Sequence, residues 1–103
     1  MTHHKYTEAR IVYDAQGSIG KLVADAEKAD FVQLSLGVCA EIEGHILDQA
    51  VTFYVISGCG TLYVDDSEII VSTSDVIEVK SGANRGWKND GDSIMEILAV
   101  KHK

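Results

Sequence analysis

Short β-type segments recur along the whole chain, and turn residues separate them at the close spacing typical of a sandwich or barrel. The pattern predicts an all-β fold of roughly 8 strands, a jelly roll or a similar β-barrel. The segments expected to be strands are Arg10–Tyr13, Phe31–Leu36, Val38–Glu43, Val51–Ile56, Thr61–Val64, Glu68–Val71, Asp75–Val79 and Ser93–Val100.

One stretch, residues 19–30, fits two interpretations. Leucine, valine and alanine residues between positions 22 and 29 are spaced as in a helical stripe. Equally, Lys21–Ala24 fits a strand that turns back over residues 25–30. We favour the strand, because every segment that follows is β-type.

The length, charge and cysteine content of the chain limit the kind of protein that it can be. The length of 103 residues predicts one domain, residues 1–103, with one modest core. Nine Lys and Arg against sixteen Asp and Glu give a net charge of -7, which makes nucleic acid and membrane surfaces unfavourable partners. Two cysteines are too few for a disulfide framework, and the N-terminus lacks an apolar signal core. We therefore expect a cytoplasmic protein.

The segment Val51–Ile56 is apolar on both of its faces. Val51, Phe53 and Val55 share one face, and Thr52, Tyr54 and Ile56 share the other. A small chain buries one face of a sheet in its own core. The second face predicts contact with another copy, and hence a homodimer.

Two stretches carry a family resemblance. Residues 53–60 read Phe-Tyr-Val-Ile-Ser-Gly-Cys-Gly, and residues 74–89 run from Ser-Asp-Val-Ile through Gly82 to Trp-Lys-Asn, ending at Asn89. In sequence and spacing they resemble the two motifs of a small single-domain cupin, over about residues 31–100. The resemblance implies a conserved β-barrel of the double-stranded β-helix type.

The resemblance also locates the metal site that cupins form from three histidines and a glutamate. The four corresponding positions here are His45, Leu47, Val51 and Arg85. Only His45 offers a lone pair, and a guanidinium is a permanent cation, so we expect a degenerate metal site and no metal cofactor. Cys39, Ser74 and Lys80 likewise replace two glycines and a proline of the motifs.

A different metal cluster is conceivable in Glu41-x-Glu43-x-His45. On a regular strand these three side chains share a face, with Asp48 near by. The alternative is a rim segment with solvated acids, which we favour because glutamates are rarely buried.

Arg85 follows the family's geometry only if it points into the barrel mouth, close to His45. A buried guanidinium needs a partner. We favour a carboxylate of the chain (Glu41, Glu43 or Asp48); the alternatives are an anionic ligand held by the arginine, or a side chain that reaches solvent at the rim. The candidate ligand-binding residues are His45, Arg85, Trp87, Phe53 and Tyr63.

Three functions remain open. The favoured one is metal-independent binding of a small molecule in an apolar barrel. The second is an enzyme, either an isomerase or epimerase or a metal-dependent oxygenase-type cupin, with His45 as the base and Tyr54, Tyr63 or Glu43 as the second proton-transfer group. The third is a dimeric scaffold without a ligand.

Overall fold

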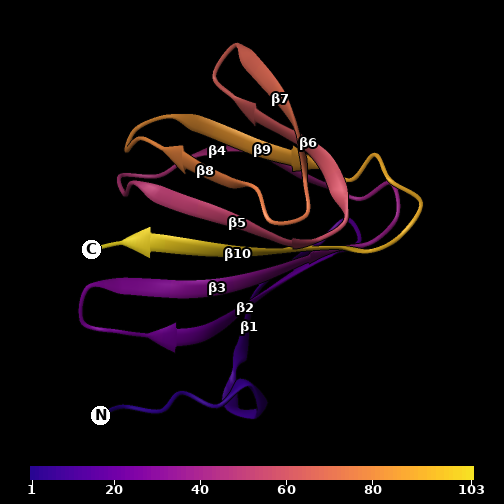
Figure 1. Cartoon of the computed structure of the whole chain (residues 1–103). Helices are drawn as coiled ribbons and strands as arrows, with labels where there is room; N and C mark the ends of the chain where they lie inside the picture. The colour runs from indigo at the N-terminus through magenta and orange to yellow at the C-terminus, as the bar shows by residue number, and fades with distance from the viewer.

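The chain is built almost entirely from antiparallel strands (Figure 1). A computed structural model describes all of residues 1–103. After a short 3-10 turn, Tyr6–Glu8, the strands are β1 (Arg10–Ala15), β2 (Ser18–Asp25), β3 (Ala29–Leu36), β4 (Glu41–Ile46), β5 (Val51–Ser57), β6 (Cys59–Val64), β7 (Ser67–Ser72), β8 (Val76–Val79), β9 (Asn84–Lys88) and β10 (Met95–His102).

The strands form two sheets that enclose one core. The larger sheet has the order β1-β2-β3-β10-β5-β8, and the smaller has the order β4-β9-β6-β7. Fourteen buried hydrophobic residues, contributed by both sheets, form a single cluster. This arrangement confirms the expected all-β jelly roll of the double-stranded β-helix type. No helix in it has the length and apolar character that crossing a bilayer requires.

Strand β5 shows how side-chain alternation builds the core. Val51, Phe53 and Val55 are buried, whereas Tyr54 and Ile56 on the other face are exposed. The alternation predicted from the sequence is therefore confirmed.

The structure settles the ambiguous stretch, corrects the start of one strand and adds a strand that was not expected. Residues 19–30 are not helical, since β2 runs to Asp25 and β3 begins at Ala29. The strand predicted from Val38 begins instead at Glu41, because Cys39 has a φ of 63° and forms part of a turn. Strand β9 is not among the expected strands, because its residues Asn-Arg-Gly-Trp-Lys lack the β-branched side chains of a typical strand.

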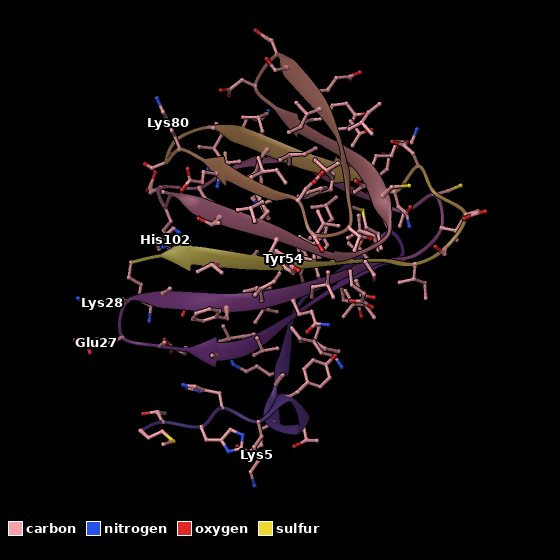
Figure 2. The ribbon with its side chains drawn as sticks, in the orientation of Figure 1. Lys5, Glu27, Lys28, Tyr54, Lys80 and His102 are labelled. Carbon is pink, nitrogen blue, oxygen red and sulfur yellow. The ribbon has the colours of Figure 1, made fainter.

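The loops gather at two opposite ends of the molecule (Figure 1). The β4–β5 and β8–β9 loops lie at one end, which we call the Arg85 end. Lys80, just after β8, and His102, at the end of β10, mark this side (Figure 2). The β3–β4 and β9–β10 loops lie at the other, the Asn89 end.

Candidate functional site

A cavity of about 280 Å³ lies between the two sheets, and ten of its thirteen lining residues are hydrophobic. The lining residues are Val12, Tyr13, Val32, Leu34, Ile42, His45, Leu47, Val51, Phe53, Arg85, Trp87, Ala99 and Lys101. The three that are not hydrophobic are all basic, and none is acidic. In a chain of net charge -7, this concentration of basic side chains is a local feature of the cavity.

A bulge in β4 brings His45 to the cavity. Ile42 pairs with Trp87 and His45 pairs with Arg85, so that Glu43 and Gly44 together lie opposite Gly86. The extra residue reverses the alternation and turns His45 inward, opposite Arg85.

Gly86 makes room for this bulge. A Cβ atom at Gly86 would lie 2.9 Å from the carbonyl oxygen of Ile42 and 3.0 Å from the nitrogen of Gly44. Real Cβ atoms do not approach backbone atoms so closely. The position of His45 therefore depends on a glycine in the neighbouring strand.

His45 stays partly open to solvent at the edge of the cavity. Its Nδ1 lies 3.2 Å from the carbonyl oxygen of Glu43. A carbonyl only accepts hydrogen bonds, so this contact places a proton on Nδ1 and leaves Nε2 of the neutral ring as an acceptor.

The same bulge separates His45 from the two glutamates. Glu41 and Glu43 line a groove on the outer side of the smaller sheet, and Nζ of Lys88 lies 4.0 Å from Glu41. Asp48 is exposed and lines neither the cavity nor this groove. The cluster of Glu41, Glu43 and His45 considered above is therefore wrong, because it assumed a regular strand. No group of three or more His, Cys, Asp and Glu side chains has a metal-binding arrangement.

The cavity does contain the positions at which the family resemblance places metal ligands. His45, Leu47, Val51 and Arg85 all line it. Three of these four side chains have no lone pair to offer a divalent cation. The donor set present does not fit the metal that the fold family implies.

Arg85 is buried, with 2% of its surface exposed, and backbone carbonyls surround it. Its Nε and Nη2 both donate to Ala83 at 3.3 Å, Nη2 donates to Lys80 at 3.0 Å, and Nη1 makes a long contact of 3.5 Å with Gln49. Desolvation lowers the pKa of Arg85, and the negative charge of Asp65 partly opposes this shift.

The carboxylate partner expected for Arg85 is absent. None of the ion pairs within 4.0 Å involves Arg85; they join Lys88 to Glu41 and Lys103 to Asp25 and Asp30. The expectation of a pair with Glu41, Glu43 or Asp48 is wrong because the loop carbonyls occupy the space around the guanidinium. Those carbonyls accept its hydrogen bonds without neutralising its charge.

Phe53 and Trp87 form the aromatic wall of the cavity. Their ring centroids are 5.1 Å apart and their planes meet at 83°, an edge-to-face contact. The Nε1 atom of Trp87 is buried and has no hydrogen-bond acceptor. Tyr63 does not belong to the site, because it lies opposite Gly86 on the outward side of β6 and lines the outer groove.

Among the lining residues that the sequence analysis did not identify, two carry polar groups, Tyr13 and Lys101. Lys101 continues the alternation of Met95, Ile97 and Ala99, which all face inward on β10. Extending that strand by one residue would have found it. Tyr13 lies on an edge strand beside a bulge, where alternation gives no clear signal.

Comparisons with known proteins bear on the family. A search of curated protein sequences finds no match. The family model for the cupin domain matches residues 40–101, which is more than half of the chain.

Several solved structures share the fold. A predicted oxalate decarboxylase from Thermotoga maritima superimposes with a TM-score of 0.81 at 18% identity, covering 98% of both chains. The polyketide cyclase RemF from Streptomyces resistomycificus has a TM-score of 0.81 at 15% identity, covering 99% of this chain and 79% of its own. An RmlC-like cupin from Shewanella frigidimarina superimposes with a TM-score of 0.81 at 16% identity, covering 100% of this chain and 93% of its own. Identities this low establish the fold alone, and together with the family match they show that the chain belongs to the cupin family.

Proposed function

We propose that this cupin binds a small organic anion in its barrel without the help of a metal. The observation that carries the proposal is the charge of Arg85: the guanidinium is buried against the cavity and has no carboxylate partner. A desolvated charge is costly until an opposite charge compensates it. A bound anion supplies that charge.

The rest of the cavity supports the same ligand. Lys101 and His45 add basic groups to the lining of the same cavity, and the lining is otherwise apolar. A ligand with an anionic head and an apolar body matches both parts of this surface. The donor set argues against a metal as the anchor, since only His45 remains of the four ligand positions.

The experiment measures binding of small organic acids, hexanoate first, by calorimetry after dialysis against EDTA. The Arg85→Met variant keeps an unbranched side chain and removes the charge. Arg10→Met is the matched control, since Arg10 is exposed and does not line the cavity. We expect binding to wild type and to Arg10→Met and at least about a 30-fold loss in Arg85→Met. Equal binding to all three proteins contradicts the proposal.

A proton-transfer enzyme, an isomerase or epimerase, is the second candidate. His45 presents a free Nε2 at the cavity, and a base of this kind needs a partner acid. Tyr54, Tyr63 and Glu43 do not line the cavity, but Tyr13 does. Exchange of the α-protons of a bound acid with deuterated water, abolished in His45→Gln, supports this candidate; no exchange above the uncatalysed rate removes it.

We also propose that the chain forms a homodimer through the outer face of β5. Tyr54 and Ile56 are each 39% exposed, and the register places Tyr54 between Val76 and Leu98. Sedimentation at micromolar concentration tests this: Tyr54→Glu shifts a dimer to a monomer, and a monomeric wild type contradicts the proposal. A scaffold without a ligand predicts the same dimer but no binding of acids.

Both cysteines are free thiols, which supports residence in a reducing compartment such as the cytoplasm.

A further inference from the structure

We infer that the ligand is a monocarboxylate with an apolar body, and that its carboxylate accepts hydrogen bonds from both Arg85 and the indole Nε1–H of Trp87. The inference rests on the proposed function and specifies the chemistry of the ligand. It starts from the one buried side-chain donor in the molecule that has no acceptor, Nε1 of Trp87.

A buried donor without a partner is rare in folded proteins, because it loses its bond to water and gains nothing in return. Trp87 is 3% exposed and lines the cavity. It lies two residues after Arg85 on β9, so both side chains leave the same face of the strand. An oxygen atom of a ligand held at Arg85 gives this donor the acceptor that the protein lacks.

Arg85 has little donor capacity left for that ligand. Nε and Nη2 direct their side-on pair of hydrogens at the carbonyl of Ala83, and the second hydrogen of Nη2 goes to Lys80. Only Nη1, with one long contact to Gln49, remains available. The guanidinium therefore cannot form the usual bidentate pair of hydrogen bonds with both oxygens of a carboxylate. The second oxygen needs another donor. Trp87 is such a donor.

The charge and polarity of the cavity limit the ligand further. Arg85 is the only fully buried cation of the lining, since Lys101 is half-buried and stays partly hydrated. One such charge is balanced by one negative charge, which favours a monocarboxylate over a dicarboxylate or a phosphate ester. Apart from His45 and Tyr13, no lining side chain accepts a hydrogen bond. A ligand rich in hydroxyl groups would leave its donors unpaired there, so its body is apolar.

The first test compares three probes of equal chain length by calorimetry: hexanoate, hexan-1-ol and the dicarboxylate adipate. Wild type is expected to bind hexanoate at least about tenfold more tightly than either of the others. In Trp87→Phe, the affinity for hexanoate falls about five- to tenfold while that for hexan-1-ol changes less than about twofold. Phe53→Leu is the control in the same aromatic pair, and it lowers the affinities for both probes by the same factor.

The second test needs no variant and keeps the inference falsifiable if Trp87→Phe does not fold. The chain has one tryptophan, so its spectrum contains one indole N–H resonance. Hexanoate is expected to move this resonance downfield and to slow its exchange with water, and hexan-1-ol is expected to do neither.

The outcomes separate the two proposals. If no organic anion binds, or if binding does not depend on Arg85, the proposed function fails. If an acid binds through Arg85 but adipate binds best, or if Trp87→Phe weakens acid and alcohol equally and the indole resonance does not move, the proposed function stands and this inference is overturned.

Discussion

Arg85 and Asn89 are buried polar side chains four residues apart, one within β9 and the other just after it, yet they stand in opposite situations. The amide nitrogen of Asn89 donates to the carbonyls of Leu36, Gly37 and Ser93 at 2.9–3.0 Å, and its oxygen accepts from the backbone nitrogen of Gly91 at 2.9 Å. This side chain is neutral and its polar atoms are all paired.

Arg85 also donates to loop carbonyls, but no carboxylate lies within 4.0 Å of its guanidinium. At each end of the barrel, a buried polar side chain thus hydrogen-bonds to loop carbonyls. The two side chains differ in charge, and we assign them different roles. The Asn89 end is complete as folded. Under the proposed function, a bound anion supplies the charge that the Arg85 end lacks, and the difference between the two ends reflects binding.

The largest expected effect is at Asn89. Asn89→Ala removes the side chain that hydrogen-bonds the carbonyls of Leu36, Gly37 and Ser93 and the backbone N–H of Gly91, and we expect a loss of about 4 kcal/mol in the free energy of unfolding. Urea denaturation measures it. Asn84→Ala is the control, since Asn84 is exposed, and it costs less than about 1 kcal/mol. Similar losses in the two variants would contradict a structural role for Asn89.

Arg85→Met is expected to cost less, about 1–2 kcal/mol. Lost hydrogen bonds destabilise the variant, but removal of a desolvated charge partly offsets that loss. In thermal melts, hexanoate raises the Tm of wild type and leaves that of Arg85→Met unchanged. A loss as large as that of Asn89→Ala, with no effect of acids on wild type, would make Arg85 a second purely structural side chain.

Gly86→Ala tests the bulge that brings His45 opposite Arg85. The added Cβ meets the backbone of β4, so we expect a loss of about 1–2 kcal/mol and a displaced His45. The ring resonances of His45 in NMR spectra report the displacement. If they and the stability stay as in wild type, the glycine is not what admits the bulge.

The smallest expected effect lies at the Asn89 end and is stabilising. Ser74 has a φ of 73°, a left-handed conformation that suits glycine. We expect Ser74→Gly to add about 0.5–1 kcal/mol in urea denaturation. Ser72→Gly, the same change within strand β7, has the opposite sign by a similar amount. If Ser74→Gly also destabilises, the backbone of Ser74 is not strained.

The sequence was sufficient for the fold where alternation is regular, as on β5. It also placed His45, Arg85, Trp87 and Phe53 together, through the spacing of the family's motifs. The sequence was not sufficient where the backbone is irregular. No residue near Glu43 and Gly44 indicates that β4 contains a bulge at this point. The absence of a carboxylate at Arg85 was equally beyond prediction, since it depends on how the loop just before β9 curls its carbonyls around the guanidinium and on Gln49 of a loop distant in sequence.

The bulge has a consequence for which substitutions this chain can accept. Gly44 and Gly86 are far apart in the chain, but one supplies the extra residue and the other leaves space for it. The residues accepted at positions 44 and 86 therefore depend on each other. In a library selected only for folding, larger side chains should appear at position 86 chiefly among members with a one-codon deletion at position 44.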